Sequence, residues 1–259
     1  MISVTNSECI RLTLHLHTSG ILLDRTASEV ARLFSRVIVS LDAPSEPLYQ
    51  EIRGVSALTT IERGVARLRR LAPNVGVTAR ATLHRMNFRE LPRLIDHARA
   101  MLLDGISFLA ADVSSSAFGR TTPGGGAPLG LSPGETAEFA DLVERTIADY
   151  GGDFATGFIA ESPDHLRRLP RYYAALHGTV PFPPVSCNAP YMSVVIEADG
   201  SVRPCFFHQV VGSVREESLE TIVTRHLPAF RQTLQMPQNP VCKRCVCSMR
   251  TGWRQAPWQ

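Results

Sequence analysis

The stretch CNAPYMSVVIEADGSVRPC, residues 187–205, holds two cysteines at its ends and a turn between them. Cys187 is followed by twelve residues, Gly200, four more residues and Cys205. Asp199 and Gly200 stand between short runs of β-forming residues, which predicts a hairpin whose glycine adopts a positive φ. Such a hairpin would bring the two cysteine thiols together.

Three more cysteines follow this stretch. After 36 intervening residues comes a Cys-x-x-Cys pair, Cys242 and Cys245, and Cys247 lies two positions further on. Thiolates are soft, anionic donors, and four of them can hold an iron–sulfur cluster or a zinc ion. Buried or free thiols without a metal are the third interpretation, and the cysteines by themselves leave all three open.

Composition excludes several classes of protein. Of the 259 residues, 44% are hydrophobic and 20% charged, which is enough for a large core. The net charge is only +3 and the arginines are scattered, so we expect no nucleic-acid partner. No run reaches the roughly 18 apolar residues that a membrane span needs, and the start has no secretory pattern. We therefore expect a cytoplasmic protein, in which clustered cysteines indicate metal before disulfide.

The first 110 residues alternate short apolar runs with helical patterns, which predicts an α/β fold with a parallel sheet and helices outside it. One helix is expected over 26–34, one N-capped by Ser56, and one starting near Asn87 with Glu90 and ending before Gly105. The predicted strands are residues 11–17, 37–41, 75–83 and 106–110.

Further helix signals lie between these strands and the cysteines. Ser132 with Glu135 opens one helix, and Ser162 opens another that runs toward Gly178. Residues 154–160 suggest an additional strand. The run PFPP at 181–184 breaks the pattern and marks a domain boundary.

Together these features resemble a radical S-adenosylmethionine enzyme with a C-terminal SPASM/twitch auxiliary iron–sulfur domain. The run ADGSVRPC and the spacing Cys-x(12)-Gly-x(4)-Cys, followed by Cys-x-x-Cys, carry the resemblance. Only Cys247 stands where the full SPASM pattern has several more cysteines, so the twitch form with one [4Fe–4S] cluster fits better. The resemblance implies an incomplete (β/α) partial barrel over 1–180 and a small β-hairpin plus helix domain over 181–259.

The cysteines and one strand end are the candidate site residues. Cys187, Cys205, Cys242 and Cys245 are the expected ligands of one cluster, with Cys247 as an alternate ligand. The run Val39-Ser40-Leu41-Asp42 is similar to the family's fourth strand, ending in Ser-Leu-Asp-Gly.

That similarity implies that Ser40 and Asp42 face the ribose and amino-acid groups of S-adenosylmethionine. Against this, serine and aspartate at a strand end are also common turn formers. His15 and His17 alternate with leucines and share one strand face, where we expect core histidines.

One departure from the family is large. The Cys-x-x-x-Cys-x-x-Cys loop and the glycine-rich loop of the first two strand–helix units are absent from the sequence. Two such units need roughly 60 to 80 residues. We therefore expect a fragment whose first two units lie outside this reading frame, with strand 11–17 as an unpaired edge that favours association.

The resemblance implies chemistry in which a 5′-deoxyadenosyl radical abstracts hydrogen from a peptide or small molecule. It implies S-adenosylmethionine only where the missing segment is supplied, and a reductant such as ferredoxin or flavodoxin. We expect that this chain does not initiate the radical alone. The alternative is a non-catalytic iron–sulfur or zinc-binding module for electron transfer or recognition.

Overall fold

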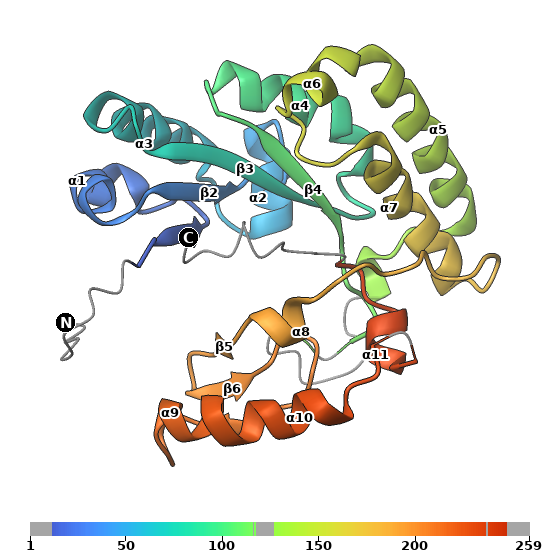
Figure 1. Ribbon diagram of the computed structural model, residues 1–259. Coiled ribbons are helices and arrows are strands. Elements are labelled where there is room, and N and C mark those ends of the chain that lie inside the picture. The colour runs from blue at the N-terminus through green and yellow to red at the C-terminus, as the bar shows by residue number, and fades with distance from the viewer. Residues whose placement is uncertain (1–11, 116, 118–126, 237, 248–259) are drawn as a thin grey trace.

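A curved parallel sheet with helices on its outer side forms the larger part of the molecule, and a smaller part holds the C-terminal cysteines (Figure 1). The structure, a computed structural model, describes residues 12–115, 117, 127–236 and 238–247. Residue 11 of the first predicted strand therefore lies outside the described residues.

The larger sheet has four parallel strands in sequence order, as predicted. Each strand is followed by at least one helix before the next begins, which is why neighbours run parallel. The strands are β1 (His15–Thr18), β2 (Arg36–Ser40), β3 (Gly76–Leu83) and β4 (Ile106–Ala110).

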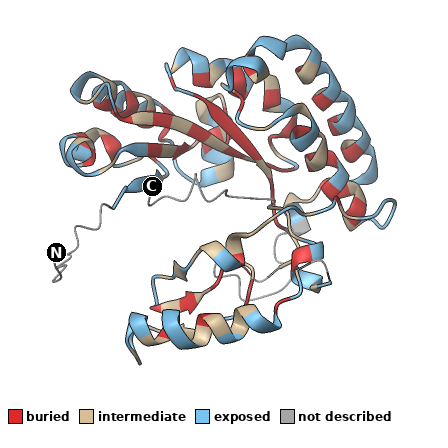
Figure 2. Cartoon of the chain, in the orientation of Figure 1, coloured by how far each residue is buried: buried red, intermediate tan, exposed pale blue. Residues whose placement is uncertain are grey.

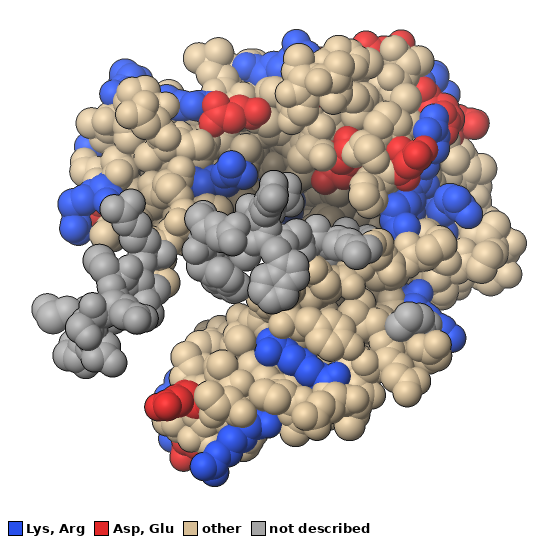
Figure 3. Space-filling model, in the orientation of Figure 1, with Lys and Arg blue, Asp and Glu red and all other residues tan. Residues whose placement is uncertain are grey.

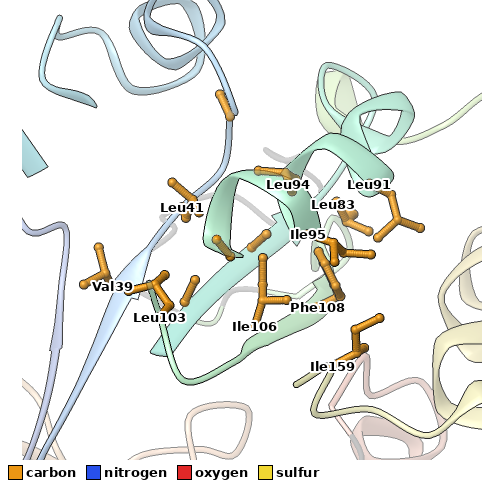
Figure 4. Packing of buried hydrophobic residues seen from close by; sticks show 14 of the residues in the cluster. Val39, Leu41, Leu83, Leu91, Leu94, Ile95, Leu103, Ile106, Phe108 and Ile159 are labelled. Atoms are coloured by element: carbon orange, nitrogen blue, oxygen red, sulfur yellow. The ribbon is translucent and has the colours of Figure 1, made fainter. Parts of the chain in front are cut away.

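The main core fills the space between this sheet and its helices (Figure 2). Side chains such as Val39, Leu83 and Phe108 point from the strands toward Leu94 and Ile95 of one covering helix (Figure 4). The helices of this part are α1 (Leu23–Leu33), α2 (Glu46–Arg53), α3 (Leu58–Leu71), α4 (Leu91–Ala100), α5 (Pro133–Asp149), α6 (Gly151–Thr156) and α7 (Pro163–Leu176), with short 3₁₀ turns η1 (Phe88–Glu90) and η2 (Ala127–Leu129).

The two faces of the sheet differ because successive strand residues point to opposite sides. In β3, Val77, Ala79, Ala81 and Leu83 are fully buried against the helices, and the residues between them are half-buried on the concave face. Strand pairing sets Arg80 beside Ser40 on one side and Ser107 on the other. The concave face therefore carries polar groups from three neighbouring strands.

Strand β1 lies at the edge of the sheet and, within the described residues, pairs only with β2. His15 and His17 share one of its faces as predicted, and Leu16 packs on the core from the other. Both histidines are exposed, so the expectation of core histidines is wrong. The reason is that an edge strand has a neighbour on only one side.

Two helix starts follow their local sequence signals. At the start of α5, the Ser132 hydroxyl accepts the Glu135 N–H, and the Glu135 carboxylate accepts the Ser132 N–H at 2.8 Å. At the start of α7, the Ser162 hydroxyl accepts the His165 N–H at 3.2 Å. Both predicted starts are confirmed, the first as a complete capping box.

The predicted cap of α3 is wrong. Its N-cap position is Ala57, and no side chain of that residue caps it. Instead, the Glu46 carboxylate accepts the N–H groups of Leu58 and Thr59, and it also accepts the Ser56 hydroxyl at 2.7 Å. A carboxylate from the preceding helix thus satisfies the free N–H groups of the first turn.

The predicted helix start near Asn87 is confirmed, because Asn87 is the N-cap residue of η1, which leads directly into α4. Its side chain makes no cap bond, and its amide donates instead to the carbonyl oxygens of Asp42 and Thr82. A further local prediction fails. Residues 154–160 are not a strand: α6 occupies their first half, and only Ile159 forms a parallel bridge, to Ile106.

The smaller part, which lies below the larger one in the view of Figure 3, contains the predicted hairpin. Val195 and Ile196 pair antiparallel with Arg203 and Val202, and Gly200 at the turn has a φ of 91°. Its elements are α8 (Ala189–Met192), β5 (Val195–Ile196), β6 (Ser201–Arg203), β7 (Gly212–Ser213), α9 (Leu219–Thr221), the π-helical turn η3 (Ile222–His226), α10 (Leu227–Thr233) and α11 (Pro240–Lys243). Within the described residues, no helix is long and apolar enough to cross a membrane.

Candidate iron–sulfur site

Five cysteine side chains line one cavity of about 450 Å³ in the smaller part. Cys187 lies before α8, Cys205 follows β6, and Cys242 lies on α11, with Cys245 and Cys247 in the loop after it. All five are free thiols. The structure thus gathers every cysteine that the sequence analysis proposed as a ligand.

Local hydrogen bonds hold these cysteines in place. The Ser193 hydroxyl donates to the Pro204 carbonyl at 2.8 Å and ties the two arms of the hairpin together beside their cysteines. The Asn239 side chain caps α11 by accepting the Cys242 N–H at 3.2 Å. The Cys245 N–H then donates to the Cys242 carbonyl at 3.2 Å, which closes the Cys-x-x-Cys turn.

The surroundings disfavour bare thiolates. Burial, together with the neighbouring cysteines, raises the pKa of Cys242 to about 11 and that of Cys245 to about 12. Burial also raises the pKa of Cys205 and Cys247. Crowded thiols of this kind become thiolates when a bound cation balances their charge, which fits a metal site.

His208 lies behind one of the thiols. Its Nε2 is 3.3 Å from Cys242 Sγ, and its ring packs edge-on against Phe230 at a centroid distance of 5.2 Å. Burial lowers the pKa of His208, so the neutral imidazole is the favoured form. This geometry suits a hydrogen-bonding partner of a cysteine sulfur rather than a metal ligand.

The spacing of the thiols bears on which metal centre fits. Within the parts of the chain that the structure describes, no three His, Cys, Asp or Glu side chains are close enough to share a single metal ion. Four sulfurs around one zinc ion would stand about 3.8 Å apart, given tetrahedral Zn–S bonds. A four-iron cluster is larger and holds its cysteines farther apart.

Ser40 and Asp42 lie where the sequence placed them, at the C-terminal end of β2. Asp42 is only 3% exposed, and one of its carboxylate oxygens accepts the Thr82 N–H at 2.9 Å. The other oxygen forms an ion pair with Arg53. Asp42 thus links the end of β2 to β3 and α2. Ser40 is half-buried and lies beside Arg80 on the concave face. Their contacts with S-adenosylmethionine stay a prediction.

A second cavity, of about 410 Å³, was missed by the sequence analysis. It lies between the concave face of the sheet and the cysteine loop, because Arg80, Glu161 and Arg168 line it together with Cys245 and Cys247. One signal was available in the sequence, since an arginine alternating with buried alanines in β3 must point to the face opposite the core.

Glu161 is the acidic group of this second cavity. The Phe108 N–H donates to its Oε2 at 3.0 Å, which fixes the carboxyl beside the middle of β4. Burial raises the pKa of Glu161 to about 7, and the positive charge of Arg80 opposes that rise. The carboxyl therefore changes charge near neutral pH.

Comparisons with known proteins agree with this geometry. Residues 187–246 match the SPASM family model, an iron–sulfur cluster-binding domain. A search of curated protein sequences gives no match. Among solved structures, the chain is similar to native anSMEcpe with bound AdoMet, at 16% identity and a TM-score of 0.57 over 91% of this chain and 64% of that one.

Two further structures contain peptides. Native anSMEcpe with AdoMet and the Kp18Cys peptide is 17% identical, with a TM-score of 0.55 over 91% of this chain and 65% of that one. SuiB from Streptococcus suis, bound to the precursor peptide SuiA, is 17% identical, with a TM-score of 0.54 over 90% and 53%. The chain spans less than two thirds of each of these proteins.

These findings confirm the predicted α/β fold, which is similar to that of anSMEcpe and SuiB. The resemblance to a SPASM domain is confirmed as well, because the family match falls on the cysteine-bearing segment.

Proposed function

We propose that Cys187, Cys205, Cys242 and Cys245 hold one auxiliary [4Fe–4S] cluster, with Cys247 as an alternate ligand. The observation that carries this proposal is the convergence of all five thiols on one cavity. The match of residues 187–246 to an iron–sulfur cluster-binding domain supports it. When bound, such a cluster would bind substrate or accept an electron as product forms.

The remaining side chains of the cavity have simpler roles. His208 Nε2 lies 3.3 Å from the Cys242 sulfur and would donate a hydrogen bond to it when that sulfur is a metal-bound thiolate. Apolar side chains, among them Phe207, Ile196 and Met236, line the cavity and keep water away from the sulfurs. These groups would shape the environment of a cluster without ligating it.

We further propose that the chain takes part in modifying a peptide by 5′-deoxyadenosyl-radical hydrogen abstraction. The peptides in two similar structures support this substrate class, and a small molecule is the alternative. S-adenosylmethionine would contact Ser40 and Asp42 only where the missing segment is supplied, so this chain would not start the radical alone. Residues 1–180 would form the barrel part and 181–259 the cluster domain.

The electron donor and the cellular location are proposed from the same family resemblance. The electron donor would be a ferredoxin or flavodoxin. The location would be the cytoplasm, where clustered cysteines indicate metal before disulfide.

A non-catalytic iron–sulfur or zinc-binding module is the second candidate function. It is favoured by one feature of the sequence, which contains no Cys-x-x-x-Cys-x-x-Cys motif to hold a second, S-adenosylmethionine-binding cluster. Such a module would serve electron transfer or recognition.

Substituting each proposed ligand by alanine tests the cluster assignment. In anaerobically purified protein, Cys187→Ala, Cys205→Ala and Cys242→Ala should each lose most of the bound iron. Cys9→Ala is the matched control and should keep it, because Cys9 lies outside the proposed motif. Unchanged iron in the first three variants would contradict the ligand set.

The same protein, supplied with S-adenosylmethionine and dithionite, tests whether this chain starts the radical alone. We expect no 5′-deoxyadenosine from this chain alone. Production of 5′-deoxyadenosine above the level of a protein-free control would show that it initiates the radical after all.

A further inference from the structure

Arg80 carries a positive charge into the second cavity, where Glu161 is the carboxyl on which that charge acts. It is half-buried on the concave face of β3, where its Nε donates to the Ser107 hydroxyl at 3.1 Å. Within the described residues, no Asp or Glu forms an ion pair with it. A guanidinium that is partly removed from water is costly unless a counter-charge is present. A ligand anion would supply that charge.

Arg168 lines the same cavity from another element. It lies half-buried on α7 and donates from one Nη to the Pro184 carbonyl, which fixes the side chain. Burial and the nearby Arg171 lower the pKa of Arg168, which indicates an environment already rich in positive charge.

Glu161 is the only carboxyl among the described residues that line this cavity. Because its pKa is raised to about 7, about half of these carboxyls are neutral at that pH. The two guanidinium groups therefore outweigh it, and the cavity has a net attraction for anions.

The shape of the guanidinium group defines the class of anion. Its planar N–H groups match the two oxygens of a carboxylate, and paired bonds of this kind are stronger than neutral hydrogen bonds. A volume of about 410 Å³ accommodates an acidic side chain with part of its peptide backbone. Cys245 and Cys247 line both cavities, so a ligand here would stand beside the proposed cluster.

We propose that Arg80 and Arg168 form a carboxylate-binding site that selects substrates carrying an acidic side chain close to the cysteine loop. This inference rests on the proposed function, whose substrate class it narrows. The other source of a carboxylate is the amino-acid end of S-adenosylmethionine, and the experiment separates the two.

Binding is measured by calorimetry on the anaerobically purified full chain. The probes are the capped peptide acetyl-Gly-Gly-Asp-Gly-Gly-amide and its Asn counterpart, which differ only in the charged group. We expect the Asp peptide to bind about tenfold more tightly, as one charge-assisted pair provides. Arg80→Gln and Arg168→Gln should each reduce this preference to about twofold or less.

Two variants refine the comparison. Arg80→Lys keeps the positive charge but loses the planar pair of N–H donors, and it should give an intermediate preference for the Asp peptide. Arg32→Gln removes an exposed arginine from α1 and should leave the preference unchanged. Equal binding of the two peptides to the unsubstituted protein would overturn the proposal, and so would a preference that survives both Gln substitutions.

Competition identifies the source of the carboxylate. Displacement of the Asp peptide by S-adenosylmethionine, with an affinity that depends on Arg80, would assign the site to the cofactor and overturn substrate selection. Tighter binding of inorganic phosphate than of the Asp peptide would overturn the carboxylate class. Iron is measured on the same samples. If the protein contains iron but binds both peptides equally, only this inference is refuted. If it prefers the Asp peptide but contains no iron, the proposed cluster is refuted.

Discussion

Replacing Glu161 by glutamine should stabilise the protein above pH 7 and have little effect near pH 5. Glutamine keeps the acceptor for the Phe108 N–H and removes the charge that burial disfavours. The pKa of Glu161 in the folded protein is raised from 4.5 to about 7. Its contribution to stability is therefore fully present below pH 4.5, where both states are protonated, and is lost as the pH rises to 7 and above.

The size of the effect follows from that pKa difference. A rise from 4.5 to about 7 corresponds to a free energy of about 3 kcal/mol. Because Glu161 lines an open cavity, water screens part of this energy, and we expect about 1 to 3 kcal/mol at pH 8. The difference between Glu161→Gln and the unsubstituted protein should grow steadily between pH 5 and pH 8.

Urea unfolding followed by circular dichroism measures this difference at several pH values. Glu29→Gln is the matched control, since Glu29 is exposed on α1 and its substitution should give no such trend. A Glu161→Gln protein whose stability differs from that of the unsubstituted chain by the same amount at pH 5 and pH 8 would refute the reasoning.

Three other substitutions have defined outcomes. Gly200→Ala should destabilise the hairpin by about 1 to 2 kcal/mol, because φ is 91° and the new Cβ would stand 2.8 Å from Arg215 Cγ; iron retained after gel filtration reports it. Ser132→Ala should lower the free energy of unfolding by about 1 kcal/mol through loss of the capping box, with iron content unchanged. Asp42→Asn should lower it by about 2 kcal/mol in urea unfolding, because Arg53 loses its counter-charge.

Each of these has a result that would contradict it. Gly134→Ala is the matched control for the hairpin, since a Cβ at Gly134 meets nothing within 4 Å; equal iron loss in both variants would speak against a turn-specific effect. A Ser132→Ala protein as stable as the original would show that the cap is dispensable. Unchanged stability of Asp42→Asn would remove Asp42 from its structural role.

Elements with purely local signals were predictable from the sequence. The run Arg36–Ser40 has β-branched apolar residues at its centre, and these favour a buried strand. Asp199 and Gly200 favour a hairpin turn through their own backbone preferences. The capping box at Ser132 needs only residues within one helical turn. In each case the forces that decide the structure act between near neighbours in sequence.

Elements whose partners lie elsewhere in the chain were not predictable. Glu46, which lies ten residues before Ser56, caps α3 in place of Ser56. The Asn87 side chain donates a hydrogen bond to the Asp42 carbonyl, although the two residues follow different strands. The cysteine site was predictable because thiols at that spacing serve mainly as metal ligands. The second cavity was missed because Arg80, Glu161 and Arg168 come from different elements and meet only in the folded chain.

The central claim is that the five cysteines around the cavity in the smaller part of the molecule hold an iron–sulfur cluster. Iron, sulfide and zinc analysis of the anaerobically purified chain, together with its visible absorption spectrum, tests it most directly. The account predicts about four iron and four sulfide per chain and a broad absorption band in the blue region. One tightly bound zinc per chain, with no iron and no visible absorption, would contradict it.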